Sequence, residues 1–516
     1  MKLDWKKFLP SLFVILTILI LVTINLEKVQ ASVTDAYDFL IDKCNWFIIL
    51  SNITAMLFSL YMMFGPYRNV RLGGSDAKPA FKTITWAAMM FCTSCGAWLV
   101  VYGFLEPIYC AAQTAIPIEA NTAQAFEYGQ MYAHYHWGPN AWCIYVPASI
   151  AIGYMLYRGE KTEGSVGEAC SPILKGKKGN VLRWLIDILS ILGAVISPVI
   201  SIGTGMPLLT ILLQDLFDIP DSVVPMLQII ILGIWVFIFS TSVYLGLKRG
   251  IKNLSNINIG LALILMLAVG IMTGVFKVFS AEISTAGLVA DNYFRLLTYT
   301  DAFGSGSFVK GWTVSYWTTY FVYMPLMGVF NAKISKGRTF KEIAFGQLVL
   351  CTLGCWVSMG TFGNYTLKLQ IEGAVNVARI LNSQGEAAAI LAILKTMPGS
   401  KIMIFALLVI CFIFLATTMD SSAFTAAEMT VKHTKNEELA PRWVRVVWAV
   451  IACAVAFTLL RVGGFLAVRT VSVITGIPLA VIMYLMILSL RKVLKEDKVI
   501  ENRDSKKEDK IHLNQN

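Results

Sequence analysis

Charged residues are scarce in this 516-residue chain, where Asp, Glu, Lys and Arg together make up 15% of the sequence. A soluble domain carries about 25%. Hydrophobic residues, in contrast, make up 56%. The composition therefore excludes an ordinary soluble domain and indicates a protein that lies largely within a membrane.

Several signatures of enzymes are also missing. The chain has only four histidines, and none is spaced from acids or cysteines as a metal ligand would be. It shows no Ser-His-Asp arrangement, phosphate-cradling glycine loop or dinucleotide fingerprint. Most of the ten cysteines lie in apolar runs, and we interpret them as small apolar side chains in packed helices. We therefore expect no enzyme, and no cofactor other than a coupling ion.

Twelve apolar runs come close to or exceed the roughly 20 residues that a membrane-spanning helix needs. The first follows three lysines and could be a signal peptide, but its length and the many runs after it favour a retained helix. The runs lie near residues 9–26, 45–65, 84–112, 138–157, 182–213, 223–247, 255–279, 311–332, 342–365, 402–428, 443–462 and 467–490.

The loops between these runs alternate in charge. The net charge of +11 comes from short Lys and Arg runs in every second loop, which form no single basic face for nucleic acid. Residues 111–136 contain no Lys or Arg, and all the charged side chains of residues 215–221 are acidic. Because cytoplasmic loops are enriched in Lys and Arg, we expect both termini to be cytoplasmic and the protein to lie in the cytoplasmic (inner) membrane.

Two stretches do not fit a simple row of spans. Residues 281–310 are too polar to cross a bilayer, and the spacing of Leu288, Tyr293, Leu296 and Leu297 predicts a short amphipathic helix on the outer surface. Residues 491–516 are polar and mixed in charge, and we expect a cytoplasmic tail there.

The third run contains groups that are costly inside a membrane. Thr93, Ser94 and Gly96 are small enough either to let the helix unwind, which would expose backbone carbonyls to a cation, or to allow close helix packing. Further along, Glu106 precedes Pro107. A carboxylate in this position needs a partner, because an unpaired charge in a membrane is expensive.

Two segments gather aromatic residues. His136-Trp137-Gly-Pro-x-x-Trp142-x-x-Tyr145 suits either an interfacial anchor or the wall of a ligand site. In the eighth run, Trp312, Tyr316, Tyr320 and Tyr323 follow one another at spacings of four, four and three, so they share one helix face. Aromatic stripes more often serve packing, but a quaternary ammonium is held by ring faces, at about 0.5–2 kcal/mol per ring.

These blocks resemble the betaine/carnitine/choline transporter (BCCT) family over nearly the whole chain. The resemblance is carried by Gly-Trp-Thr-x5-Thr-Tyr-x2-Tyr with the later Ile-Ser-Lys-Gly-Arg-Thr, by the His-Trp-Gly-Pro and Tyr-Gly-x-x-Glu-Pro blocks, and by Thr417-Thr-Met-Asp-Ser-Ser. It implies an all-α, leucine-transporter-like fold of two inverted five-helix repeats. These would be 84–280 and 311–490, following two leading helices in 1–83, with 281–310 as the surface connection.

The resemblance also implies an aromatic box at mid-membrane. The first repeat would contribute Tyr109, Trp137, Trp142 and Tyr145, and the eighth run would contribute Tyr320 and Tyr323, with Trp312 nearer a second, outer position. Where the family usually has two adjacent tryptophans, this chain has Thr319-Tyr320. One wall is therefore smaller and more polar, which leaves the identity of the substrate open.

The coupling ion is implied by the same resemblance. Thr417 and Thr418 keep hydroxyls that coordinate sodium in the family, and the carbonyls of Cys92 and Cys95 would supply further ligands. A second sodium position looks lost, since Ala194 and Pro198 stand where the family has threonines. Sodium-free carnitine exchangers carry an arginine where this chain has Asn258, which favours one coupled Na⁺ over exchange.

Together these observations predict a secondary active transporter that carries quaternary-ammonium solutes (glycine betaine, carnitine or choline) by alternating access, with sodium-coupled uptake. The alternatives are a sodium-independent carnitine/betaine exchanger, the same fold carrying an amino acid or a dimethylsulfonium compound, and a membrane receptor or channel. The family further implies a homotrimer, and the lipid bilayer is the other partner expected.

Overall fold

The structure, a computed structural model, describes residues 2–113, 118–158, 164–245, 250–432, 439–462 and 464–499. Within them the chain is helical except for loops and one small antiparallel sheet, in which β1 (Lys2–Leu3) pairs with β2 (Val431–Lys432). The helices are α1 (Trp5–Ile24), α2 (Leu26–Phe64), α3 (Thr83–Ser94), α4 (Ala97–Ala112), α5 (Ala123–His136), α6 (Pro139–Cys143), α7 (Val146–Arg158), α8 (Val166–Ala169), α9 (Gly176–Phe217), α10 (Val224–Leu245), α11 (Gly250–Thr273), α12 (Val275–Thr298), α13 (Ser315–Ile334), α14 (Phe340–Phe345), α15 (Thr352–Ile371), α16 (Val377–Gln384), α17 (Glu386–Lys395), α18 (Ser400–Met429), α19 (Arg442–Val462) and α20 (Gly464–Glu496).

Each of the twelve predicted runs overlaps at least one helix. Seven helices in the described part of the chain are long and apolar enough to cross a membrane, or eight if the bent pair α3–α4 forms one span. The membrane-spanning, all-α architecture is therefore confirmed. The count of twelve spans and the limits of the two repeats stay predictions.

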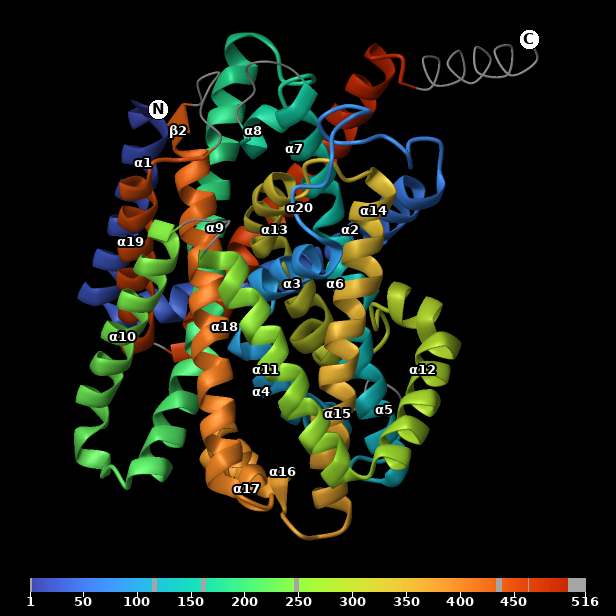
Figure 1. Cartoon of the computed structure of the whole chain (residues 1–516), viewed down its shortest axis with the longest axis vertical. Helices are drawn as coiled ribbons and strands as arrows, with labels where there is room; N and C mark the ends of the chain where they lie inside the picture. Colours follow the sequence, from blue (N-terminus) through green and yellow to red (C-terminus); the bar gives the residue numbers. More distant parts are fainter. Residues whose placement is uncertain are drawn as a thin grey trace.

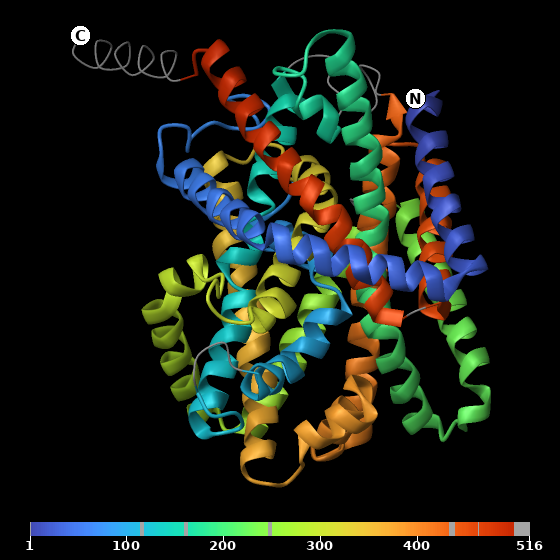
Figure 2. The same cartoon turned by 180° about the vertical axis from the view of Figure 1, so that it is seen from behind.

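The helices form an elongated bundle. α1 begins and α20 ends at the same end of it, while α16 and α17 lie at the opposite end (Figure 1). This placement fits an even number of crossings. Seen from behind, α2 runs obliquely across the bundle and packs beside α20 (Figure 2).

The third predicted run is a broken helix. α3 ends at Ser94, α4 begins at Ala97, and the two axes are bent by 73°. Cys95 and Gly96 between them have extended backbone conformations. A Cβ atom on Gly96 would lie 2.2 Å from the Ser201 hydroxyl oxygen of α9, so only glycine lets the two backbones approach this closely. The unwinding that the small residues allowed is present.

Three predicted boundaries need correction. The run 138–157 is not one helix, because it is divided into the short α6, which begins at Pro139, and α7, which begins at Val146, with Ile144 and Tyr145 between them. The run 255–279 ends at Thr273, because Gly274 adopts a φ of +99° that stops α11. The tail expected from residue 491 begins inside α20, which continues to Glu496, and residues 500–516 lie outside the described residues.

The helix expected within 281–310 is present but longer than predicted. α12 begins directly after Gly274 and ends at Thr298. It is amphipathic: Leu296 is buried against the bundle, and the other side exposes large apolar side chains that suit contact with lipid, namely Phe276, Phe279, Ile283 and Phe294.

Candidate functional site: an aromatic column beside the broken helix

Aromatic rings from α4, α13 and the end of α5 converge in the interior of the bundle. Trp98, two residues after the helix break, lies at their centre. Its ring centroid is 4.6 Å from that of Trp137, 5.6 Å from that of Tyr320 and 5.8 Å from that of Tyr323. Trp98 and Trp137 are each only 2% exposed, and Tyr323 is fully buried. The rings therefore pack against one another in a dry interior, where ring faces are the groups that a cation would meet.

The predicted stripe on α13 accounts for one wall of this cluster. Nearly every residue of α13 is buried, so its aromatic face meets neighbours rather than lipid. A π-helical turn, Val309–Val314, precedes the helix and carries Trp312. Such single-turn π segments often occur at functional sites.

The seven residues predicted for substrate binding fall along one column rather than in one box. Tyr109 and Trp312 form a pair at 5.3 Å, towards the end of the bundle opposite the termini. Trp142 and Tyr145 form another pair at 5.8 Å. Between the pairs, contacts at 5.8–6.3 Å run from Trp312 through Tyr316 to Tyr320 and on to Tyr145. The site roles of these residues stay predictions.

Tyr109 lies away from the central rings. Its hydroxyl donates to the Glu386 carboxylate of α17 over 3.1 Å. Glu386 lies outside the predicted spans, and burial raises the pKa of its carboxyl, an effect that the Tyr109 hydroxyl partly offsets. A ring and a carboxylate thus stand together where the column meets the outer end.

A single carboxylate fixes the walls of the column. Glu106 is fully buried and accepts hydrogen bonds from the indole of Trp137, the hydroxyl of Tyr316 and the imidazole of His136, each over 2.7 Å. These are the partners that the sequence required but could not identify. Hydrogen bonds to a charged acceptor are worth about 1.5–3 kcal/mol each. Glu106 therefore holds rings from two helices in fixed orientations.

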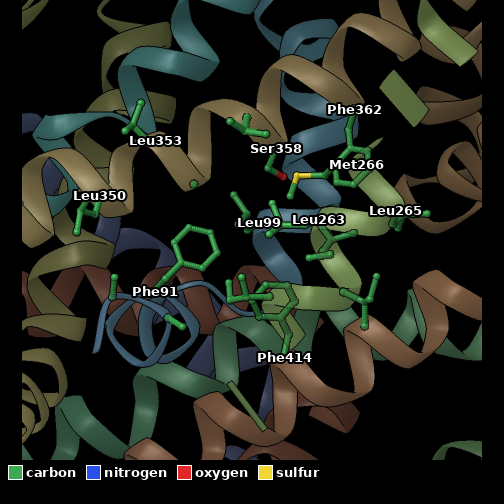
Figure 3. Close-up of a pocket in the computed structure, with 18 of the residues that line it drawn as sticks. Phe91, Leu99, Leu263, Leu265, Met266, Leu350, Leu353, Ser358, Phe362 and Phe414 are labelled. Atoms are coloured by element: carbon green, nitrogen blue, oxygen red, sulfur yellow. The ribbon is translucent and has the colours of Figure 1, made fainter. Parts of the chain in front are cut away.

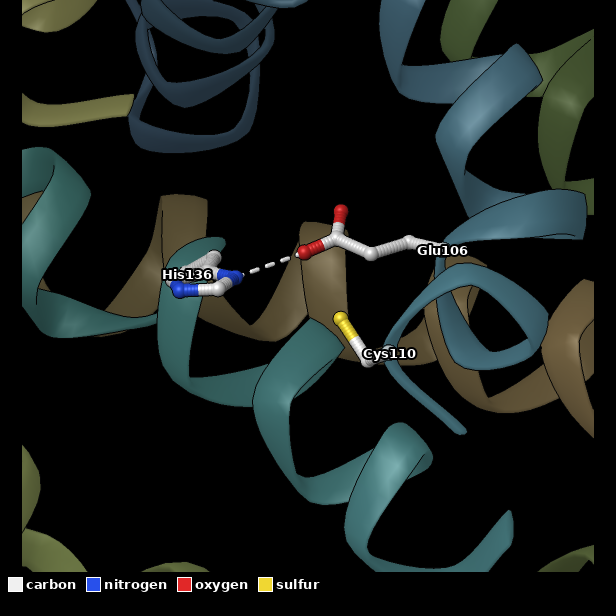
Figure 4. Close-up of side chains that lie close together, drawn as sticks. All are labelled: Glu106, Cys110 and His136. Atoms are coloured by element: carbon white, nitrogen blue, oxygen red, sulfur yellow. Dashed lines mark hydrogen bonds and ion pairs between the residues drawn. The ribbon is translucent and has the colours of Figure 1, made fainter. Parts of the chain in front are cut away.

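The same carboxylate lies near a thiol, although sequence spacing indicated no metal site. Ligand atoms of Glu106, Cys110 and His136 lie within 4.8 Å of one another (Figure 4). Both oxygens of Glu106 already accept hydrogen bonds, and the second nitrogen of His136 lies 3.0 Å from the Thr313 hydroxyl. The geometry is accounted for by a hydrogen-bonded hub, which needs no ion.

A small cavity of about 60 Å³ opens beside the central rings. Ligand sites for drug-sized molecules are usually 300–1,000 Å³. The column is thus nearly closed in this conformation. The cavity is lined by Trp98, Tyr102, Ile200, Gly311, Trp312, Ser315, Tyr316 and Thr319.

A larger cavity of about 420 Å³ lies on the flank of the bundle, between α3, α4, α11, α15 and α18 (Figure 3). Its lining is almost wholly apolar, and Ser358 and Thr83 are the polar members. Lining residues such as Leu263 and Leu353 are about half exposed at the bundle surface. This cavity suits an apolar group and not a charged solute.

The residues predicted for sodium are partly assembled. The hydroxyl of Thr418 lies 3.3 Å from the carbonyl oxygen of Cys92, and the hydroxyl of Thr417 lies 3.5 Å from it. Because α3 ends at Ser94, this carbonyl lacks the helical partner that an unbroken helix would provide. The three oxygens are buried and suit a hard cation. No contact between the Cys95 carbonyl and either threonine is found among the described residues.

Sequence reasoning missed the most central ring. Trp98, Tyr102 and Tyr109 are separated by four and seven residues, the spacing of one helix face. In the sequence, the third apolar run drew attention for its small residues and for Glu106, and its aromatic residues were assigned no common face. The spacing of Trp98, Tyr102 and Tyr109 predicts an aromatic face on α4.

Apolar spans that enclose a ring-lined, nearly dry column beside a broken helix define an integral membrane protein built to enclose a small solute. A profile of the family described as "BCCT, betaine/carnitine/choline family transporter" matches residues 6–499. The chain belongs to this family, and it is therefore a membrane transporter and not an enzyme. Among solved structures, it is similar to one described as "Substrate-bound outward-open state of a Na+-coupled sialic acid symporter reveals a novel Na+-site", with 12% sequence identity, a TM-score of 0.46 and 86% of each chain covered.

Proposed function

We propose that this transporter carries small quaternary-ammonium solutes, of the glycine betaine, choline or carnitine type, across the cytoplasmic membrane. Uptake is coupled to sodium and proceeds by alternating access. Both termini lie in the cytoplasm, in keeping with the basic loops.

The observation that carries this proposal is the cavity between aromatic rings. One side of it is lined by Trp98 and Tyr102 of α4, and the other by Trp312 and Tyr316 of the π-helical turn and α13. A quaternary ammonium offers no N–H to an acceptor, so ring faces are the groups that recognise it. Three or four rings at about 0.5–2 kcal/mol each supply roughly 2–8 kcal/mol. The upper part of that range corresponds to millimolar to micromolar affinity.

The tyrosine hydroxyl groups of the column have partners within the protein. The hydroxyl of Tyr316 donates to Glu106, that of Tyr320 donates to the His136 carbonyl, and that of Tyr323 lies 3.2 Å from the Ser201 hydroxyl. The O–H donors of Tyr316 and Tyr320 are thus used within the protein, so these tyrosines offer ring faces rather than O–H donors to the solute. Thr319, which replaces an aromatic residue of the family pattern, adds a hydroxyl to the cavity wall.

Charge acts in the same direction. Glu106 lies behind two of the rings, hydrogen-bonded to Trp137 and Tyr316. An ionised carboxylate polarises both donors towards itself and makes the ring faces more negative. A cation is therefore favoured over a neutral solute of the same shape.

The coupling ion binds where the broken helix meets α18. The carbonyl oxygen of Cys92 and the hydroxyl oxygens of Thr417 and Thr418 form its first ligands. Sodium at this point joins α3 to α18 and fixes the hinge at Cys95 and Gly96. Because Trp98 follows the hinge directly, the ion and the onium site are mechanically linked.

The test is transport by purified protein in liposomes. Labelled glycine betaine, choline and carnitine are each offered with and without an inward sodium gradient. Saturable uptake of at least one, accelerated by the gradient, is the expected result. Equal exchange in sodium-free buffer would instead support the exchanger, and absence of flux for all three would overturn the proposal.

A further inference from the structure

Trp98 occupies the position that an onium head group would take in a fully open aromatic box. Its ring lies almost parallel to that of Tyr323, at an interplanar angle of 5°, and 4.6 Å from the ring of Trp137. The ring of Tyr320 approaches it from a third side at 5.6 Å. One side chain thus covers three rings, two of them predicted in the second repeat to bind substrate.

The position of Trp98 is fixed by the broken helix. Its indole N–H donates to the carbonyl of Ser94, the last residue of α3, over 3.2 Å. The hydrogen bond crosses the break at Cys95 and Gly96, so it ties the ring to both halves of the helix. A tryptophan that is 2% exposed and held in this way is a wall, and it is not free to move aside without bending the hinge.

The cavity lies on one side of this wall. Trp98 lines it together with Tyr102, Trp312 and Tyr316. Among the described residues, Trp137, Tyr320 and Tyr323 do not line it. Trp98 therefore forms the boundary between the cavity and the deeper rings of the column.

We propose that Trp98 is a specificity-determining residue that sets the largest onium head group the transporter accepts. The head group binds on the side of the Trp98 ring that faces the cavity, and the ring limits the head group to a trimethylated nitrogen. Removal of the ring joins the cavity to the space over Trp137, Tyr320 and Tyr323, so bulkier heads then fit. This inference rests on the proposed function and adds the size limit to it.

The experiment measures inhibition of labelled onium uptake in liposomes by tetramethylammonium and tetraethylammonium, for the wild type and Trp98→Ala. Four extra methylenes cannot enter the wild-type cavity, so tetramethylammonium inhibits much more strongly. One methylene in a pocket is worth about 10–200-fold in discrimination. We expect the ratio of the two inhibition constants to fall by at least about tenfold in Trp98→Ala.

Two further variants separate size selection from general damage. Trp98→Phe keeps a smaller ring and should give an intermediate ratio. Trp235→Ala removes another buried tryptophan, on α10 against Phe412, and should leave the ratio unchanged. If Trp98→Ala does not fold, Trp98→Phe alone is the test. A ratio of the two inhibition constants that changes at least about twofold supports the proposal, and an unchanged ratio overturns it.

The outcomes are distinct from those of the proposed function. A wild type that transports no onium would overturn the proposed function. A wild type that transports onium solutes, with Trp98 variants that keep its tetramethylammonium-to-tetraethylammonium ratio, would overturn the role of Trp98 alone. Loss of affinity for both ions by the same factor would also overturn it, because Trp98 would then be a wall without size selection.

Discussion

The indole nitrogen of Trp137 lies 2.7 Å from a carboxylate oxygen of Glu106, with Trp137 2% exposed and Glu106 fully buried. Trp137 caps the end of α5, and Glu106 lies on α4 next to the proline that follows it. The contact joins the two ring-bearing segments of the first half of the chain. Through Tyr316 it reaches the aromatic face of α13 as well.

We expect Glu106→Gln to weaken both the fold and onium binding. The amide would turn an N–H₂ group towards donors that now point at an oxygen, and it would remove the negative charge behind the rings. Loss of one charged hydrogen bond costs about 1.5–3 kcal/mol of folding stability, and loss of the charge and of the fixed ring orientations should also lower the affinity for the onium. Thermal unfolding and substrate binding to the purified protein measure the two effects. The exposed Glu127→Gln is the control, and an unchanged affinity in Glu106→Gln would contradict the hub.

Trp312 tests whether ring faces bind the solute. Trp312→Phe keeps a ring beside the cavity and should change the affinity for the onium about threefold or less. Trp312→Leu keeps an apolar side chain but has no ring face. Its binding free energy for the onium should therefore weaken by about 0.5–2 kcal/mol, which lowers the affinity roughly 2–30-fold. Titration of the detergent-solubilised protein with tetramethylammonium measures both. Equal losses in the two variants would indicate that the side chain only packs.

Thr418 tests the coupling ion. Thr418→Ala removes one of the two hydroxyls near the Cys92 carbonyl, whereas Thr418→Ser keeps it. Loss of an oxygen ligand to a charged group costs about 1.5–3 kcal/mol. The sodium concentration for half-maximal uptake should therefore rise about tenfold or more in the alanine variant and change little in the serine variant. Identical sodium curves for Thr418→Ala and the wild type would remove this position from the ion site.

Glu386 gives the outer end of the column a pH dependence. Burial raises the pKa of its carboxyl above the ordinary 4.5. Acidification through that raised pKa neutralises the carboxyl beside Tyr109 and removes its attraction for an approaching cation, so uptake at low substrate concentration should fall as the pH falls. The Glu386→Gln variant should not show this fall in uptake, and its uptake rate should be low at every pH. A wild-type and variant pair with parallel pH profiles would exclude Glu386 from the entry path.

Local features of this fold could be predicted from the sequence. The small residues around Gly96 allowed an unwound segment, and the spacing from Trp312 to Tyr323 placed four rings on one face of the π-helical turn and α13. Both are consequences of helix geometry over a few residues. The apolar runs likewise located the helices, with errors where a helix ends inside an apolar run, as at Ile144–Tyr145 and at Gly274.

The contacts between distant segments could not be predicted in this way. The 73° bend directs α4 so that Trp98 enters the ring cluster, and no pattern in the sequence gives a bend angle. Tyr109 meets Glu386, 277 residues away, because α17 folds over the outer end of α4. The structure divides the residues of the predicted box into a central cluster and two flanking pairs, and this division depends on the tertiary arrangement.

The most direct test of the account compares choline with 3,3-dimethylbutan-1-ol, its neutral isostere in which carbon replaces the quaternary nitrogen. Binding to the purified protein is measured for both under identical sodium concentrations. If ring faces recognise the positive charge, choline binds at least about tenfold more tightly, which is the yield of three rings at the low end of their range. Equal affinity for the two molecules would contradict recognition of a quaternary ammonium by this aromatic column.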